Sequence, residues 1–445
     1  MRIVIAGVGE LGAHLAKMLS REKHEIVLID TDNDQLKNLA ATNDIMTIQG
    51  EVTSHKLLMK AGTDRADLFI AVMLAEDTNI VSAIMAKKLG AKLTVARITN
   101  SELLNCENRK ILTGLGIDSV VYPEYLVARE LINILHRSGV STFVDFSEGK
   151  LSMLAVKIDI NAPIINKTLS EIADDYRLKF CAVAILRNEK TVIPHKDIVC
   201  EPNDTVYMVT NHDNIKNILR YFGHREENIN QVMILGGSHI GRLIARELDK
   251  RYNIKIFEAD LDAANYLSDI LNNALVIHGD GTQIDLLLEE GLRNTDAFIA
   301  VTGNSEANIL ACLLAKSEGA KHTVAEIENL DYIHLAERLG IDTIINKKLI
   351  AADHIYRYTL TGSVSMIKYL AATEAEVLEF VVSPKSKIIE RPLCETNFPK
   401  DAIIGGLVRN NTGYIATGSA WIQPEDRVVV FSMPSAIGEV SRFFK

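Results

Sequence analysis

The chain contains the stretch MRIVIAGVGELG (Met1–Gly12), and this stretch decides the fold of its first half. An apolar, β-branched run leads into a Gly-x-Gly-x-x-Gly motif, and the residues that follow have helical spacing. In such a motif Gly7 permits a tight turn, Gly9 lets the backbone approach a pyrophosphate, and Gly12 allows the helix to pack closely on the strand. A strand, a glycine turn and a helix in this order predict the first unit of a nucleotide-binding, doubly wound sheet.

A carboxylate at the end of the second predicted strand strengthens this interpretation. Asp30 lies 18 residues after Gly12 and is placed to accept hydrogen bonds from an adenosine ribose. The same negative charge disfavours a 2′-phosphate, which argues against NADP. It does not separate NAD or NADH from ATP or ADP, because all of these share the adenosine diphosphate half.

Other residues of the first predicted crevice come from the ends of neighbouring strands. Arg97 closes the fifth strand, where it either pairs with a phosphate or forms a surface ion pair. Met73 follows the fourth strand and either lines the crevice or belongs to the core, and Glu10 beside the phosphate position is expected to turn to solvent. The full set of predicted contacts in the first half is Gly7, Val8, Gly9, Glu10, Leu11, Gly12, Asp30, Thr31, Asp32, Gly50, Glu51, Met73, Leu74 and Arg97.

The whole pattern occurs twice. A second glycine motif begins at Gly236, and the landmarks Gly50, Gly62, Asp67 and Gly90 recur as Gly279, Gly291, Asp296 and Gly319. The second copy is altered at the site: Ser238 replaces the middle glycine, Glu258 stands for Asp30, and Glu326 takes the place of Arg97. We therefore expect weaker phosphate binding there, at a second site formed by Gly236, Gly237, Ser238, His239, Ile240 and Glu258.

Each copy contains six apolar runs separated by helical segments, which predicts two parallel α/β sheets of Rossmann type. The predicted strands are Arg2–Val8, Glu25–Asp30, Asp44–Gln49, Asp67–Met73, Leu93–Ile98 and Ser119–Tyr122, then Gln231–Leu235, Lys255–Glu258, Ala274–Ile277, Ala297–Thr302, Thr323–Ile327 and Thr343–Ile345. A long helix follows each sheet, predicted over Glu124–Arg137 and Lys347–Thr359, and then a small α+β module with short strands and turns. Residues His224–Asn230 are polar and predict a linker between the halves.

Composition excludes several classes of protein. The 445 residues carry a net charge of −10 and no long Lys/Arg cluster, so a nucleic-acid partner is not expected. The longest apolar runs, Leu68–Ala75 and Ile309–Ala315, are too short to cross a bilayer, so no direct lipid insertion is expected. With no signal peptide ahead of the first strand, we expect a cytoplasmic protein.

The sequence contains no recognisable catalytic or metal-binding constellation. Motifs such as Gly-x-Ser-x-Gly, His-Glu-x-x-His and the P-loop are missing, and the 12 histidines are scattered singly. The five cysteines form no Cys-x-x-Cys pair, and we expect them to be reduced and mostly in the core. We predict no enzymatic activity, although an NAD-dependent oxidoreductase is kept as an alternative.

The glycine motif with Asp30 and Asp32, the landmarks Gly50, Gly62 and Asp67, and the duplicated layout resemble the RCK family, regulators of potassium conductance. Two RCK pairs in one chain resemble the TrkA regulatory subunits of Trk potassium-uptake systems. The resemblance implies RCK N-terminal domains over 1–123 and 230–346, crossover helices over 124–138 and 347–361, and RCK C-terminal domains over 139–225 and 362–445.

The resemblance also implies how such a chain acts. RCK proteins pair through crossover helices and assemble into a gating ring, here a homotetramer peripheral on the inner face of the cell membrane. The implied ligand is an adenine nucleotide, and the implied partner is a Trk-type membrane potassium transporter subunit. A nucleotide sensor for a different membrane client, such as an antiporter, stays open as an alternative.

Overall fold

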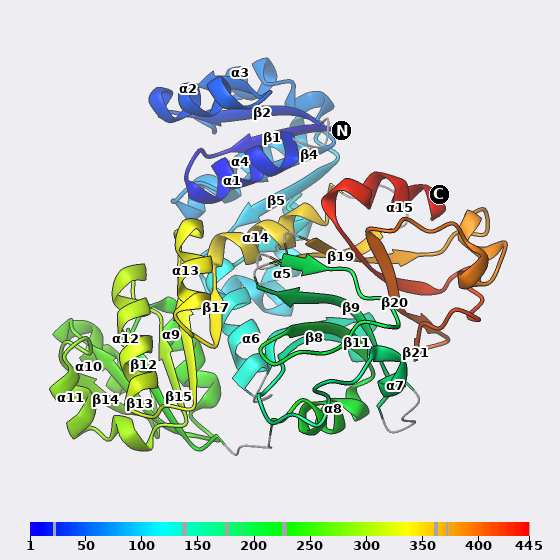
Figure 1. Ribbon diagram of the computed structural model, residues 1–445. Helices are drawn as coiled ribbons and strands as arrows, with labels where there is room; N and C mark the ends of the chain where they lie inside the picture. The colour runs from blue at the N-terminus through cyan, green and yellow to red at the C-terminus, as the bar shows by residue number, and fades with distance from the viewer. Residues whose placement is uncertain are drawn as a thin grey trace. The chain divides into compact units, whose positions relative to one another are not determined.

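The computed structural model describes residues 1–20, 24–135, 140–173, 178–188, 190–224, 229–359, 364–370, 373 and 375–444. These residues form two compact units. Figure 1 labels their helices and strands. The first unit contains Met1–Val127 with Asn346–Leu360, and the second contains Ala128–Ile345 with Thr361–Lys445.

The sheet of the first unit is fully parallel, with the strand order β3-β2-β1-β4-β5-β6. Its strands are β1 (Arg2–Ala6), β2 (Glu25–Asp30), β3 (Met46–Gln49), β4 (Leu68–Ala71), β5 (Leu93–Arg97) and β6 (Ser119–Val121). Its helices are α1 (Glu10–Ser20), α2 (Asn33–Thr42), α3 (His55–Lys60), α4 (Glu76–Leu89), α5 (Cys106–Leu115) and the start of α6 (Pro123–Leu135). This order confirms the predicted doubly wound sheet, and its direction reverses between β1 and β4, where such folds bind ligands.

The second parallel sheet repeats this order as β14-β13-β12-β15-β16-β17. Its strands are β12 (Gln231–Leu235), β13 (Asn253–Glu258), β14 (Leu275–His278), β15 (Ala297–Ala300), β16 (His322–Glu326) and β17 (Thr343–Ile345). Its helices are α9 (His239–Leu248), α10 (Leu261–Ile270), α11 (Ile284–Glu289), α12 (Ser305–Ser317) and α13 (Ile333–Arg338). The observed strands differ from the predicted ones by a few residues at their ends.

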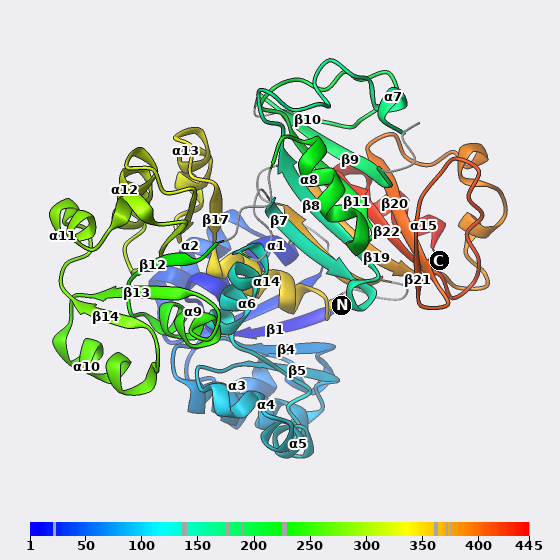
Figure 2. The same ribbon diagram turned by 90° about the horizontal axis from the view of Figure 1, so that it is seen from below.

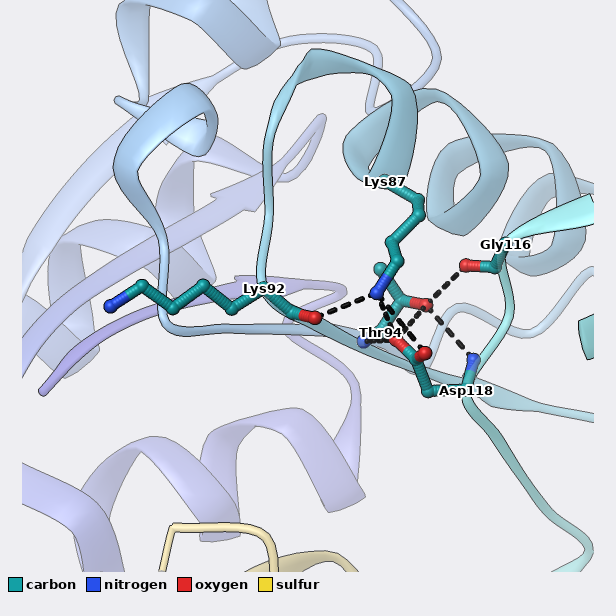
Figure 3. A network of polar contacts seen from close by, with 5 residues as sticks. All are labelled: Lys87, Lys92, Thr94, Gly116 and Asp118. Atoms are coloured by element: carbon teal, nitrogen blue, oxygen red, sulfur yellow. Dashed lines mark hydrogen bonds and ion pairs between the residues drawn. The ribbon is translucent and has the colours of Figure 1, made fainter.

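A lysine and an aspartate hold the amino edge of the first sheet, opposite the glycine turn (Figure 3). Lys87 Nζ donates to the Asp118 carboxylate at 2.8 Å and to the Lys92 carbonyl at 2.6 Å. The Thr94 backbone N–H also donates to Asp118, at 2.8 Å. Lys316, Thr323 and Asp342 make the corresponding contacts in the second sheet. The duplication thus extends to the contacts that join the fifth and sixth strands.

The small modules contain antiparallel five-stranded sheets, in the orders β10-β9-β11-β8-β7 and β18-β19-β22-β20-β21. The first consists of β7 (Val140–Phe146), β8 (Leu151–Lys157), α7 (Leu169–Ala173), β9 (Phe180–Arg187), β10 (Lys190–Val192), β11 (Thr205–Thr210) and α8 (Ile215–Tyr221). The second consists of β18 (Val364–Leu370), β19 (Ala375–Val381), β20 (Ala402–Arg409), β21 (Thr412–Ile415), β22 (Arg427–Ser432) and α15 (Ile437–Phe443). One apolar cluster contains buried residues from both modules, including Phe146, Met153, Val377 and Phe431, so their sheets share a core.

Short 3-10 turns complete the fold at Thr63–Arg65, Ser101–Leu104, Ser147–Gly149, His212–Asn214, Leu292–Asn294, Leu330–Tyr332, Lys387–Ile389, Leu393–Glu395 and Pro434–Ala436. The predicted turns before β11 and β22 are built alike, because Asn203 and Glu425 both have a φ of 68°. In each module an arginine that the sequence analysis missed pairs with the turn aspartate through two nitrogens: Arg187 with Asp204, and Arg409 with Asp426. This charge-assisted pairing fixes both turns in the same way.

The second crossover helix is α14 (Lys347–Tyr356), and it belongs to the first unit. It packs against α1, beside the first glycine motif, as Figure 2 shows with α14 in yellow and α1 in blue. Tyr358, just after α14, donates its hydroxyl to Ser119 Oγ at 2.5 Å. The helix ends three residues earlier than predicted, at Tyr356 rather than Thr359. The first crossover helix, α6, is described as far as Leu135, and the rest of its predicted span and most of the predicted linker lie outside the described residues.

The expectation for the cysteines is only partly correct. Cys200 and Cys312 are buried, but Cys106 and Cys394 are exposed and Cys181 is half-buried. All five are free thiols. Burial raises the pKa of Cys200 to about 11 and that of Cys181 to about 12, so these two remain protonated at neutral pH.

Candidate nucleotide-binding site

Two glycines of the first motif are required by the fold, while the third leaves space. Gly7 has a φ of +116°, and a Cβ atom on Gly12 would lie 1.9 Å from the Gly7 carbonyl oxygen. A Cβ atom on Gly9 would meet nothing within 4 Å. Since Gly9 directly precedes α1, this open space lies at the helix N-terminus, where free N–H groups and the helix dipole favour a phosphate.

Asp30 holds the glycine loop through backbone hydrogen bonds. Its carboxylate is buried and accepts hydrogen bonds from the backbone N–H of Val8 at 2.7 Å and of Asp32 at 3.0 Å. Oδ1 also accepts from the Thr31 hydroxyl at 3.4 Å, so the lone pair left for a further donor is on Oδ2. The structure thus places Asp30 at the end of β2, as the spacing predicted, and against the glycine turn.

Thr31 and Asp32, the two residues after Asp30, lead into helix α2. Thr31 is exposed, and the Asp32 carboxylate caps α2 by accepting from the backbone N–H of Asp34 and Gln35. These hydrogen bonds, the one from Gln35 above all, lower the pKa of Asp32. Asp32 is therefore ionised, with part of its carboxylate already used as a helix cap.

The ends of β3 and β4 complete the mouth of the crevice. The Gly50 N–H donates to the Asp30 carbonyl oxygen at 2.8 Å, and Glu51 beside it is exposed. Met73 is half-buried, and Leu74 is 87% exposed. An apolar side chain this exposed at a strand end is available to contact a bound base.

Asn79 is a buried residue whose role the sequence analysis missed. Its Oδ1 accepts from the Met73 N–H at 2.7 Å, and its Nδ2 donates to the carbonyls of Met73 at 2.9 Å and Arg97 at 3.0 Å. These bonds end β4 at Ala71 and hold the carboxyl ends of β4 and β5 together. Asn308 makes the same contacts to Thr302 and Glu326 in the second copy, and this recurrence was the sequence signal.

Arg97 forms an ion pair, but the pair is largely buried rather than on the surface. Its Nη2 lies 3.5 Å from Glu124 Oε1, and the two side chains are 18% and 12% exposed. Within the described chain, Arg97 Nε and Glu124 Oε2 are buried and have no hydrogen-bond partner. A buried charged group with an unused hydrogen-bonding atom is costly, so this pair can gain from a ligand.

Glu10 turns largely to solvent, as expected, and it also forms an ion pair that the sequence did not indicate. The side chain is 63% exposed, yet its Oε2 lies 2.7 Å from Lys348 Nζ. Lys348 belongs to α14, which the sequence places after the second sheet. The preceding residue, Lys347, lies 3.9 Å from Glu124. Two lysines at the start of α14 thus reach acidic residues on α1 and α6.

The second glycine motif keeps the loop and changes the phosphate position. Gly236 has a φ of +106°, and Glu258 accepts from the Gly237 N–H at 2.7 Å, as Asp30 does from Val8. Ser238 caps α9 by accepting from the Gly241 N–H at 3.3 Å. His239 is exposed and Ile240 is buried. The side chain of Ser238 therefore satisfies an N–H group that a phosphate would otherwise contact.

No group of three or more His, Cys, Asp or Glu side chains in the described part of the chain is arranged to hold a metal ion. No helix in the same residues is both long enough and apolar enough to cross a membrane.

Comparisons with known solved structures support the fold. The chain resembles a structure titled "GsuK Channel", with a TM-score of 0.63 and 16% identity over 99% of this chain and 78% of that one. It also resembles "Crystal Structure of the GsuK RCK domain", with a TM-score of 0.62 and 16% identity over 100% of this chain and 94% of that one. At this identity the likeness shows a twin RCK-type fold.

Comparisons of sequence identify the family. The TrkA-N domain model matches residues 3–123 and 232–347, and the TrkA-C domain model matches residues 153–223 and 377–445. The chain is 32% identical to "Trk system potassium uptake protein TrkA homolog 1" of Methanosarcina mazei, over all of both chains. It is 30% identical to "Trk system potassium uptake protein TrkA" of Haemophilus influenzae, over 100% of this chain and 99% of that one. With two TrkA-N and two TrkA-C domains and full-length similarity to these proteins, the chain belongs to the TrkA family.

Proposed function

We propose that this protein is a nucleotide-sensing regulatory subunit of a Trk-type potassium-uptake transporter. The observation that carries the proposal is the first glycine crevice, which has open space at Gly9, a loop-holding Asp30 and a crossover helix packed beside it. The names of the full-length relatives supply the potassium-uptake context. The protein would act at the inner face of the membrane, on a separate membrane-embedded subunit.

An adenine nucleotide, either NAD or NADH or else ATP or ADP, is the proposed ligand. The carboxylate of Asp30 suits an unphosphorylated ribose 2′-hydroxyl, and the N-terminus of α1 suits a diphosphate. Structural neighbours titled "GsuK channel bound to NAD" and "Crystal structure of the GsuK bound to ADP" support both ligand types for this fold. No catalytic step is proposed, because the relatives that match over the full chain carry the names of potassium-uptake proteins.

Self-assembly into a tetrameric ring is supported by an apolar surface that occurs on both N-terminal domains. In the first copy it consists of Val81 on α4 and of Ile111 and Leu115 on α5, which are 44–59% exposed. In the second copy the corresponding residues, on α12, on α13 and directly after α13, are also apolar and exposed: Leu310, Leu335 and Leu339. Apolar surface repeated at equivalent positions favours association between equivalent domains.

Gating is proposed to follow from unequal nucleotide affinity of two ring conformations, because a ligand shifts an equilibrium only through such a difference. Small-angle scattering of the purified protein should give different profiles with saturating ATP, ADP and NADH. Ion flux in vesicles that contain the Trk subunit should change with the same ligands. Identical profiles together with unaltered flux would contradict nucleotide gating.

Co-purification of tagged protein from native membranes tests the partner. Retention of a Trk-type membrane subunit supports the proposal. Retention of a different membrane protein, such as an antiporter, would favour the alternative of a nucleotide sensor with another client.

A further inference from the structure

We infer that Lys348 is a phosphate-site residue of the first nucleotide crevice, supplied by the crossover helix that follows the second sheet. This inference rests on the proposed nucleotide binding and names a contact that the glycine motif does not contain. It begins with Glu10, the first residue of α1 and the fourth residue of the motif. The backbone of Glu10 therefore lies beside the space where a phosphate would bind.

A carboxylate at this position opposes an anionic ligand unless a cation accompanies it. Lys348 is that cation, since its ammonium lies 2.7 Å from Glu10 Oε2. The two partners differ in environment: the Lys348 side chain is 16% exposed, whereas that of Glu10 is 63% exposed. Lys348 is thus fixed by its surroundings on α14, while Glu10 is able to move into solvent when a phosphate arrives.

The location of Lys348 in its own helix supports a role outside that helix. Asn346 caps α14 by accepting from the Leu349 N–H, so Lys347 and Lys348 are its first two residues. A positive charge is unfavourable at a helix N-terminus, because the helix dipole is positive there. Both lysines instead face carboxylates of the first unit, Lys347 near Glu124 and Lys348 at Glu10.

The packing of α14 keeps Lys348 at the crevice. The helix packs against α1, and Tyr358 beyond its end is bonded to Ser119 at the start of β6. With α14 held in this way, the Lys348 ammonium can contact a phosphate oxygen in place of Glu10 Oε2. The exchange keeps the positive charge paired and relieves the repulsion between Glu10 and the ligand.

Substitutions at the two positions should change nucleotide affinity in opposite directions. Lys348→Gln should weaken ADP and ATP binding to the full-length protein by about tenfold, the size expected for one lost charge-assisted contact. Lys348→Arg should recover most of this loss. Glu10→Gln should strengthen ADP and ATP binding, because it removes the competing carboxylate. Lys110→Gln, at an exposed lysine on α5, is the matched control and should bind like the wild type.

Titration calorimetry with adenosine, ADP and ATP separates a phosphate contact from a structural one. If Lys348 contacts phosphate, Lys348→Gln should leave adenosine affinity unchanged and should weaken the salt dependence of ADP binding. A loss that is equal for adenosine and ADP, or weaker ADP binding in Glu10→Gln, would show a purely structural ion pair and overturn the inference. If the wild type binds nucleotide and the Lys348→Gln variant binds it equally well, this inference is overturned and the proposed function is not. A wild-type protein that binds no nucleotide overturns the proposed function as well.

Discussion

Asp30 accepts hydrogen bonds from the Val8 and Asp32 N–H groups, and we predict that it also binds the nucleotide ribose. Asp30→Ala should lower nucleotide affinity by about 1.5–3 kcal/mol, since charge-assisted hydrogen bonds are lost. Calorimetry with NADH and ATP measures this effect, and Asp34→Ala, at an exposed carboxylate of α2, serves as the control. Unchanged affinity in Asp30→Ala would reject Asp30 as a ribose ligand.

Asp67 makes the stability of the first sheet depend on pH. The Lys92 ammonium at 2.7 Å, together with the Arg2 backbone N–H at 2.8 Å, lowers the pKa of this carboxyl in the folded protein. A lowered pKa stabilises the fold above the unfolded value of about 3.9, and this stabilisation is lost as the pH falls through the folded value.

The test of this dependence compares urea unfolding of the wild type and Asp67→Asn at several pH values. At pH 7 the variant should be less stable by on the order of 1 kcal/mol, and the gap should narrow below about pH 4 and close once the pH is below the lowered folded value. Asp44→Asn, at an exposed carboxylate, should show no such gap. A gap that persists unchanged into strong acid would contradict the assignment.

At the scale of the element, two glycines of the first strand-turn-helix unit have different tasks. We expect Gly9 to be needed for nucleotide binding and Gly12 to be needed for folding. Gly9→Ala meets no atom within 4 Å, so the variant should fold normally but should bind nucleotide about tenfold or more weakly. Gly12→Ala brings a Cβ within 1.9 Å of the Gly7 carbonyl and should lower stability by about 1–3 kcal/mol or more. Thermal unfolding combined with calorimetry distinguishes the two, and equal effects on stability would contradict the assignment.

At the start of α9, a substitution toward glycine should strengthen nucleotide binding instead of weakening it. Ser238 caps this helix, so Ser238→Ala should cost about 1 kcal/mol of stability, whereas Ser238→Gly should cost only a few tenths. We expect Ser238→Gly to bind nucleotide more tightly at the second site, because it frees the Gly241 N–H and removes a side chain from the phosphate position. Weaker binding by this variant would show that the serine hydroxyl contacts the ligand.

For the whole molecule, the predicted difference between the halves must be measured in the intact chain. Separate halves cut near residue 225 would remove α14 from the first unit, where it packs on α1. Calorimetry of the full-length protein should instead resolve two classes of site. Gly9→Val should abolish the tighter class and Ser238→Val the weaker one. If Ser238→Val removed the tighter class, our interpretation of the second motif would be wrong.

The local pattern of the sequence determined much of the fold of this protein. Strand order, glycine turns and the duplication follow from hydrophobic periodicity and from residues with special backbone conformations, which act over short distances in sequence. For this reason the spacing alone was enough to place Asp30 and Glu258 at the ends of their strands, whereas their hydrogen bonds to the glycine turns came from the structure. The positions of Gly7 and Gly12 carry the same information, because their requirement is steric and local.

Tertiary structure decided what lies around the site. Lys348 is far from Glu10 in sequence, and no periodicity indicates that α14 packs on α1 rather than on the sheet that precedes it. The clamp formed by Asn79 and the partner of Arg97 depend on which strand ends meet and how deeply they are buried. Contacts of this kind arise from packing between distant segments, so only the folded chain shows that the first crevice is bordered by a helix from the other half.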